Sequence, residues 1–249
     1  MTIVAGREEH LARQQQALAR GTAVTHVVVG MGPQPGSTVT LQADGALPLA
    51  RARNAGADIA LAEGAELLVF LDVDCIPGPT LVERYADAAA RCGPTLLCGP
   101  VTYLPPGSTD LVPDPHPARP DPPDGALVPE DRRELFWSLS FAVTGEAWHR
   151  SGGFCEEYRG YGAEDTDFAL TARDRGLAMA WVGGAHAFHQ HHPPTRHDPA
   201  RVAEIVANAR LFHRRWGTWP MTGWLQELAA AGAVEFDPTH DHLTTGAQT

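Results

Sequence analysis

An apolar run at positions 66–71, which ends in two aspartates, constrains the fold of this chain more than any other feature. The run reads ELLVFL and shows no alternation of apolar and polar residues. A strand of this kind is buried on both faces, as in a parallel sheet that helices cover on each side. Asp72 and Asp74 follow directly, and open α/β sheets bind their ligands at the carboxyl ends of strands. The sequence therefore predicts an α/β fold with a candidate site at this strand end.

The rest of the chain indicates strands and helices in alternation. The pattern predicts strands at 2–5, 24–29, 95–104 and 178–182, and helices at 8–20, 48–63, 80–91, 164–175 and 199–216. Ordered structure is also expected at 134–143, whereas the tail from Thr239 is expected to be frayed. The sequence contains no internal repeat, so we expect a single domain, residues 1–249.

Residues 104–130 differ in composition from both flanks. Nine of the 21 prolines of the chain fall between Leu104 and Pro129. A loop of more than about 12 to 15 residues inside a compact domain is usually a functional lid, a binding loop or an insertion. We therefore expect a flexible loop here.

The charge balance excludes several kinds of partner. The chain has 19 basic residues, all of them arginine, against 30 acidic residues. Nucleic acids and anionic membranes require clustered positive charge, so neither is expected as a partner. The sequence shows neither the roughly 18 to 20 apolar residues of an integral membrane segment nor a secretory signal, which predicts a cytoplasmic location. The lysine-free, alanine-rich composition is typical of a GC-rich bacterial source.

Two segments carry candidate metal ligands. Asp72 and Asp74 would let a divalent ion bridge the strand end to a phosphate, and a solvated turn is the alternative reading of this pair. The second segment contains His189, His191 and His192, and imidazole suits Mn, Fe, Co, Ni and Zn. Its spacing differs from the H-E-x-x-H helix of zinc proteases, which disfavours a zinc hydrolase. The alternative here is a surface loop with one or two buried histidines.

A glycine-rich segment at 152–167 leads into a predicted helix. It reads GGFCEEYRGYGAEDTD, so Glu164, Asp165 and Asp167 fall in the first helical turn. Acids in that turn complement the helix dipole, which is the alternative to a functional role, and the dipole is expected to keep Asp165 ionised. An ionised carboxylate beside a glycine-lined, aromatic pocket is what a general base for a sugar hydroxyl needs.

Together with the segment ARNAG at 52–56, these motifs resemble the family 2 nucleotide-sugar glycosyltransferases of the GT-A fold. The order of A-R-N-x-G, D-x-D and G-G-F to E-D-x-D is the same, and the match spans most of the chain. The last segment is similar to the catalytic part of β-1,4-galactosyltransferases and polypeptide N-acetylgalactosaminyltransferases. The resemblance implies a Rossmann-like, mixed but mostly parallel sheet that is flanked by helices.

The resemblance also implies a metal site and a donor. Asp74 would hold Mn²⁺, or Mg²⁺, against the diphosphate of a nucleoside-diphosphate sugar. His189 or His191 would complete the metal site, with His192 as a further candidate, because the region of His189 looks like the terminal metal histidine of those enzymes. Asp72 would lie nearer the ribose or the sugar.

Further roles follow from the same resemblance. Arg53 and Asn54 would contact the nucleotide, Glu164 would bind sugar hydroxyls, and Asp165 would be the catalytic base. The E-D pair carries the base in inverting relatives, so this pair favours inversion without a covalent intermediate. Trp137, which follows the proline-rich loop, would stack on a sugar, and the loop would close over the bound donor as a lid.

The implied division is a nucleotide-binding half at 1–103, the flexible loop at 104–130, and an acceptor and metal half at 131–238. The sequence departs from the family in two places. An aspartate that binds the nucleobase is missing near the end of the second predicted strand, so uridine is a default choice of base. Arg7 stands where a Pro-Thr pair usually ends the first strand; it could reach a phosphate, and we expect it to extend into solvent instead.

Two other functions share parts of this pattern. A nucleotidyltransferase would have a similar sheet and acidic metal site, but it would need a glycine-rich, lysine-containing phosphate loop that the sequence lacks after its first strand. A nucleotide-sugar-binding domain without catalysis would have lost the base, whereas the E-D pair is present. The acceptor is expected to present a hydroxyl group, and its class, the donor sugar and the oligomeric state stay open.

Overall fold

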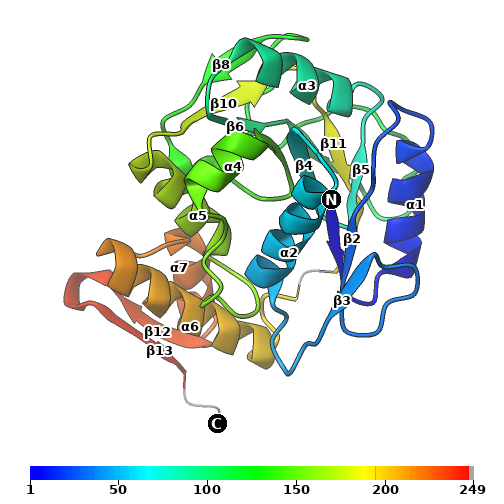
Figure 1. Ribbon diagram of the computed structural model, residues 1–249. Helices are drawn as coiled ribbons and strands as arrows, with labels where there is room; N and C mark the ends of the chain where they lie inside the picture. The colour runs from blue at the N-terminus through cyan, green and yellow to red at the C-terminus, as the bar shows by residue number, and fades with distance from the viewer. Residues whose placement is uncertain (194, 247–249) are drawn as a thin grey trace.

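The computed structural model describes residues 1–193 and 195–246, in which helices surround mixed β-sheets (Figure 1). The first sheet is parallel and consists of β1 (Thr2–Val4), β2 (Val28–Met31) and β3 (Val39–Leu41). The largest sheet has the order β4 (Leu67–Leu71), β9 (Ser140–Thr144), β6 (Thr95–Cys98), β10 (Ala178–Val182) and β8 (Leu127–Pro129). The Leu71 N–H donates to the Met1 carbonyl at 3.1 Å, so the start of β1 lies beside the end of β4.

A third, small sheet lies next to the end of β4 and consists of β5 (Cys75–Pro77), β11 (Ala187–His189) and β7 (Val101–Tyr103). Strand β11 pairs antiparallel with β5 and parallel with β7. In this register His189 lies opposite Cys75. The pairing therefore brings the histidine segment to the aspartate segment, although the two are far apart in the sequence.

The α/β class and the helix-flanked, mixed sheet agree with the prediction, but the largest sheet is less parallel than expected. Strand β9 lies between β4 and β6 and runs antiparallel to both, whereas β6 and β10 are parallel. Because β9 runs against β4, it begins where β4 ends, and the Asp72 N–H donates to the Leu139 carbonyl at 3.0 Å. The segment that precedes β9 is thereby placed at the candidate site.

Seven α-helices are assigned within the described residues: α1 (Glu8–Leu18), α2 (Leu49–Ala62), α3 (Leu81–Arg91), α4 (Gly145–Ser151), α5 (Glu164–Asp174), α6 (Pro199–Trp216) and α7 (Thr222–Ala230). Short 3-10 helices occupy Arg133–Leu135 and Pro238–His240. Among these helices, none combines the length and apolar character that crossing a membrane requires.

The largest sheet is buried on both faces, as the apolar run at 66–71 predicts. One face packs against α2, α4 and α5 in an aromatic cluster that includes Phe70, Phe141, Trp148, Phe154 and Phe168. The rings of Phe70 and Phe141 stack with their centroids 4.3 Å apart. The other face packs against α3. Burial of each such side chain contributes about 1.5 to 3 kcal/mol, so this double layer fixes the strand ends that carry the site.

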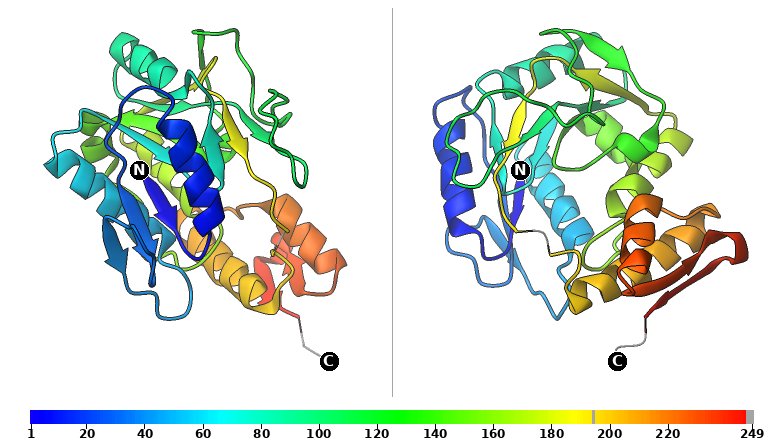
Figure 2. Two further views of the ribbon diagram at one scale, coloured as in Figure 1. Left: turned by 90° about the vertical axis from the view of Figure 1, so that its right-hand side faces the viewer. Right: turned by 180° about the vertical axis from the view of Figure 1, so that it is seen from behind.

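The C-terminal part forms a separate apolar cluster and is more ordered than predicted. Helices α6 and α7 lie together with the antiparallel pair β12 (Val234–Asp237) and β13 (His242–Thr245) at one corner of the molecule (Figures 1 and 2). Val234 and Leu243 are buried against this helix pair. The expectation of a frayed tail from Thr239 is therefore wrong up to residue 246. This segment has too few apolar residues to show a strand pattern in the sequence, but it pairs with β12 in the fold. Residues 247–249 lie outside the described residues.

Two other expectations differ in their boundaries. The strand expected at 24–29 begins at Val28, and the single strand expected at 95–104 is two strands, β6 and β7, which belong to different sheets. Gly99 separates them: a Cβ atom at this position would lie 2.0 Å from the Ala185 carbonyl oxygen. The close approach of two backbones at Gly99 thus turns the chain from one sheet to the other.

The proline-rich segment at 104–130 is tied to the body of the molecule. It contains β8, which pairs antiparallel with β10. The fully buried Arg119 side chain donates to the carbonyl oxygens of Gly99 and Trp137 at 2.7 and 3.1 Å. A buried guanidinium with such partners anchors the middle of the segment. Its predicted role as a lid stays a prediction.

Candidate metal and carboxylate site

The turn after β4 carries both aspartates and is held by a buried glutamine of α1. The Gln14 amide donates to the carbonyl oxygens of Asp72 and Cys75 at 2.8 and 2.9 Å and accepts from the Thr2 hydroxyl at 2.7 Å. The Cys75 N–H donates to the Asp72 carbonyl, which closes the turn. This turn gives the two carboxylates different neighbours.

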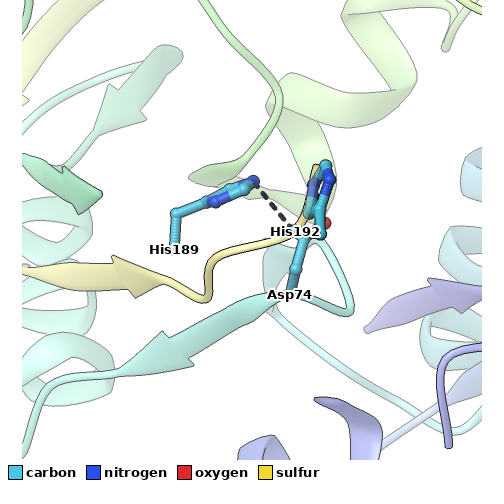
Figure 3. Close-up of side chains that lie close together, drawn as sticks. All are labelled: Asp74, His189 and His192. Carbon is cyan, nitrogen blue, oxygen red and sulfur yellow. Dashed lines mark ion pairs between the residues drawn. The ribbon is translucent and has the colours of Figure 1, made fainter. Parts of the chain in front are cut away.

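Asp74 lies against two histidines, and the three side chains point toward one another (Figure 3). The Nε2 atoms of His189 and His192 each lie 3.4 Å from an oxygen of the Asp74 carboxylate. Ligand atoms of the three residues all lie within 4.8 Å of one another. One carboxylate oxygen and two imidazole nitrogens fit a divalent transition-metal ion better than Mg²⁺ or Ca²⁺.

The structure brings His192, and not His191, to Asp74. His191 is exposed, whereas His189 is buried and His192 is half-buried. The chain leaves β11 at Gln190, whose N–H donates to the Asp74 carbonyl at 2.7 Å. This hydrogen bond fixes the turn that directs residue 192 inward. The local sequence HQHH offers both histidines equally, so only the path of the backbone separates them.

Electrostatics favour an ionised Asp74. Burial alone would raise its pKa, but the hydrogen bond from His192 and the charges of His189 and Arg7 outweigh burial, and the pKa of Asp74 is lowered. Burial lowers the pKa of His189, which favours the neutral imidazole that a cation binds. Arg7, which was expected to extend into solvent, instead forms an ion pair with Asp74.

The second aspartate belongs to a buried charge network. The Arg53 guanidinium of α2 donates to Asp72 at 3.1 Å and to Glu164, the first residue of α5, also at 3.1 Å. The other oxygen of Glu164 accepts from the Gly162 N–H at 3.1 Å. A buried arginine needs such partners to offset the loss of hydration. Arg53 therefore joins the strand end that carries the aspartates to the helix start that carries the E-D pair.

Asn54 holds the glycine-rich segment. Its amide N–H₂ donates to the Phe154 carbonyl and to the Glu156 carboxylate at 2.9 Å, and its oxygen accepts from the Phe154 N–H at 2.9 Å. Gly153, with φ +74°, lets the backbone pass this side chain, because a Cβ atom there would lie 2.8 Å from the Asn54 oxygen. The amide is occupied by this segment, so the nucleotide contact predicted for Asn54 stays untested.

Asp165 is half-buried at the start of α5, and Thr166 donates to its carboxylate from the backbone N–H at 2.7 Å. Burial and the neighbouring Glu164 raise the pKa of Asp165 to about 7. The expectation that the helix dipole keeps this group ionised is therefore wrong near neutral pH, because burial outweighs the dipole. Burial likewise raises the pKa of Asp72 to about 6. A carboxylate that titrates near neutrality can accept and release a proton.

Asp167, the last acid of the E-D-x-D motif, has a structural environment. Its carboxylate accepts hydrogen bonds from the Tyr158 hydroxyl, the Arg215 Nε and the Trp216 Nε1 at 3.1, 2.7 and 2.7 Å. Arg215 and Trp216 end helix α6. This buried group therefore connects α5 to the C-terminal helices.

Aromatic rings extend from the cluster of Asp74, His189 and His192 to Trp137. The centroid of the Tyr103 ring lies 4.7 Å from that of His189 and 5.9 Å from that of His116. The centroid of the His116 ring lies 5.1 Å from that of Trp137, which is half-buried. Tyr103, which is 47% exposed, is a residue that the sequence reasoning missed. The sequence signal that could have identified Tyr103 is an aromatic residue at the end of a strand, directly before the proline-rich segment.

The fold is that of the GT-A glycosyltransferases. No family model matches the sequence, and no curated protein matches it. Among solved structures, GalNAc-T7 with UDP, GalNAc and Mn²⁺ superposes with a TM-score of 0.62 at 13% identity, over 90% of this chain and 48% of that one. The chain thus spans about half the length of GalNAc-T7.

Two structures of Drosophila β-1,4-galactosyltransferase 7 are also similar. The catalytic domain with xylobiose has a TM-score of 0.46 at 19% identity and is matched over 74% of this chain and 63% of that one. A mutant with manganese, UDP-Gal and xylobiose has a TM-score of 0.49 at 18% identity, over 77% of this chain and 69% of that one. The match to GalNAc-T7 is the one on which the fold assignment rests.

Proposed function

We propose that this chain is a metal-dependent glycosyltransferase that moves a sugar from a nucleoside-diphosphate sugar, with uridine as the default base, to an acceptor hydroxyl. One observation carries the proposal. Arg53 bridges Asp72 and Glu164, so the strand end with the Asp74 cluster adjoins the helix start with Asp165. A metal-binding set and a carboxylate with a pKa of about 7 then share one site. The UDP and Mn²⁺ bound in the GalNAc-T7 structure support the same class.

Asp74, His189 and His192 would hold the divalent cation. When bound, the cation supplies positive charge that stabilises the departing nucleoside diphosphate. Mn²⁺ fits this set of ligands better than Mg²⁺ does, because two of the three ligands are imidazoles. His192, and not His191, would be the second histidine ligand.

Asp165 would be the general base, and the reaction would proceed with inversion. Its carboxylate accepts the proton of the acceptor hydroxyl while the hydroxyl oxygen attacks the anomeric carbon and the bond to the diphosphate breaks. Glu164 and Asp72, fixed by Arg53, would bind sugar or ribose hydroxyls. Proton and leaving group balance in a single displacement, so no covalent intermediate with the protein is required.

The neighbouring residues would position these groups. Asn54 would act through the glycine-rich segment that leads to Asp165, and not by direct contact with the nucleotide. Trp137 would stack on a sugar ring, and its contacts with His116 and with the Arg119 guanidinium, whose carbon lies 5.7 Å from the ring centroid, support a preformed wall. Because Arg119 is anchored, only the parts of the proline-rich segment on either side of it would move.

The two alternatives predict different observations. A nucleotidyltransferase would release pyrophosphate, and a binding domain without catalysis would bind the nucleotide without turnover. The raised pKa of Asp165 favours an enzyme over the binding domain, because a half-buried carboxylate with no ion pair among the described residues carries a cost that catalysis explains.

The first test is a calorimetric titration with UDP, GDP, CDP, ADP and their sugars, each with Mn²⁺ and with a chelator. We expect one nucleotide to bind, in a Mn²⁺-dependent manner. A donor identified in this way is then incubated with hydroxyl acceptors, and the anomeric configuration of the product is read by NMR. Nucleotide binding that the chelator leaves unchanged would contradict the metal-dependent reading.

His192→Ala and His191→Ala form a matched pair for the metal site. The two residues are neighbours of the same type, but only His192 lies near Asp74. We expect His192→Ala to weaken Mn²⁺ binding by at least tenfold, which corresponds to about 1.4 kcal/mol of binding free energy. We expect His191→Ala to leave the affinity for Mn²⁺ within about twofold of the parent. Equal effects of the two changes would contradict the assigned ligands.

A further inference from the structure

Arg7, His189 and His192 all lie against the carboxylate of Asp74. Its Nη1 donates to Asp74 Oδ2, and the same oxygen lies 3.4 Å from His192 Nε2. The other oxygen, Oδ1, lies 3.4 Å from His189 Nε2. Both carboxylate oxygens are therefore engaged, one of them by a permanent positive charge, since arginine does not lose its proton in proteins.

The two partners of this ion pair differ in freedom. The Asp74 side chain is 10% exposed and its backbone carbonyl accepts from the Gln190 N–H at 2.7 Å. Arg7 lies in the connection between β1 and α1, and its side chain is 31% exposed. Gly6, with φ +58° and open space around it, precedes Arg7. The guanidinium can therefore leave Asp74 without disturbing the core, whereas the carboxylate stays in place.

We propose that Arg7 is an internal competitor of the divalent cation for Asp74, which holds the carboxylate when no cation is bound and leaves it when a cation binds. The proposal rests on the metal site of the proposed function. Arg7 occupies Oδ2, the oxygen that faces His192, and a guanidinium and a divalent cation repel each other, so the two positive groups compete for one carboxylate. The measured affinity for the cation is then lowered by the free energy of the ion pair.

The same ion pair has a role in the protein without cation. A buried carboxylate that lacks a positive neighbour is costly, and removing one partner of a buried pair leaves the other uncompensated. Arg7 therefore supplies the counter-charge that the cation would otherwise supply. Loss of Arg7 should destabilise the cation-free protein and leave the Mn²⁺-saturated protein nearly unchanged.

The experiment is a titration of MnCl₂ alone, without nucleotide, into the whole chain and into Arg7→Gln at pH 8. We expect Arg7→Gln to bind Mn²⁺ about tenfold more tightly. Thermal melting is the second readout: the variant should melt below the parent without Mn²⁺, and the difference should close at saturating Mn²⁺. Should Arg7→Gln fail to fold, Arg7→Met, which keeps the aliphatic stem, is measured in the same way.

Arg13→Gln is the matched control, because Arg13 is an exposed arginine of α1 and its replacement removes the same charge. We expect its Mn²⁺ affinity to equal that of the parent. Equal or weaker Mn²⁺ binding by Arg7→Gln would overturn the proposal, and so would the same gain in Arg13→Gln. Failure of the metal site itself is distinguishable, because then neither the parent nor Arg7→Gln binds Mn²⁺ and His189→Ala changes nothing.

Discussion

At the residue scale, Asp165 has an environment that its position in the sequence does not reveal. The first turn of a helix favours an ionised acid, yet burial and Glu164 raise the pKa of Asp165 to about 7. Glu164 is paired with Arg53, whereas the hydrogen bonds found to Asp165 within the described residues come from Thr166. The two neighbouring acids of one motif therefore differ in role: one fixes the network, and the other can titrate.

A pH profile tests the role of Asp165 as base. Because the carboxylate must be ionised to accept a proton, log kcat/KM at saturating Mn²⁺ should rise with pH up to about 7 and then level off. Asp165→Asn should lose about two to four orders of magnitude in kcat while retaining Mn²⁺-dependent nucleotide binding. A variant that keeps parental turnover, or a profile that falls through pH 7, would exclude Asp165 as the base.

The same pKa predicts a change in stability. The pKa of Asp165 rises from 3.8 to about 7 on folding, so between these values the folded state binds more protons and the free energy of unfolding falls as pH increases. Asn carries no such cost. Asp165→Asn should therefore be more stable by about 2 kcal/mol at pH 8, a value reduced for solvent near a half-buried group. The gain should disappear below about pH 4, and urea unfolding at both pH values measures it.

Other residue-scale features show where sequence reasoning ends. Asp74 and His189 could be placed in one site from their motifs, but the choice between His191 and His192 depends on the turn at Gln190. Arg7, which was expected in solvent, pairs with Asp74 in the turn after β4, a residue distant in the sequence. Pairings of this kind follow from strand order, which local patterns do not encode.

At the scale of elements, helix α2 acts through Asn54 on a segment 100 residues away. Asn54→Ala removes three hydrogen bonds and should lower the free energy of unfolding by about 1 to 3 kcal/mol. Because the segment leads to Asp165, kcat should fall more than Mn²⁺ affinity. Asn54→Asp retains the acceptor for the Phe154 N–H but places a carboxylate oxygen against the Phe154 carbonyl and the Glu156 carboxylate, so it should be at least as destabilising. Parental stability with weaker nucleotide binding would indicate direct contact with the ligand instead.

The predictability of the elements follows from their length and burial. Helix α6 matches its predicted range of 199–216 because Pro199 opens a helix-forming segment that Gly217 ends, and α5 starts at the predicted Glu164 because acids fill its first turn. Strand β9 and the hairpin β12–β13 were not predicted with their directions or partners. Short strands depend on neighbours for their stability, so their pairing appears only in the assembled sheet.

At the scale of the whole molecule, two buried charged groups connect parts that are distant in the sequence. Arg53 joins α2 and the end of β4 to α5, and Asp167 joins α5 to the end of α6. The first turn of the helix with the proposed base is thus held by Arg53 of α2 and by the end of α6. Arg53 thereby links Asp72, two residues before Asp74, to Glu164, the neighbour of Asp165.

The proposed sharing of Asp74 between Arg7 and the cation predicts a linkage between ligands of the whole site. A nucleoside diphosphate brings negative charge close to the cation, and this charge offers the displaced Arg7 guanidinium a new partner. UDP should therefore increase Mn²⁺ affinity, and Mn²⁺ should increase UDP affinity by the same factor, since the coupling free energy is reciprocal. A coupling of about 1 to 3 kcal/mol corresponds to roughly 5- to 150-fold.

In Arg7→Gln this coupling should be smaller. The cation then displaces no charged side chain from Asp74, and no displaced guanidinium is available to pair with the diphosphate. The four titrations of the cycle, Mn²⁺ with and without UDP and UDP with and without Mn²⁺, measure it in parent and variant, with Arg13→Gln as control. A coupling of equal size in parent and Arg7→Gln would mean that UDP and Mn²⁺ assist each other by direct contact alone. A smaller coupling in the variant would place Arg7 in the step that makes nucleotide and cation bind as a unit.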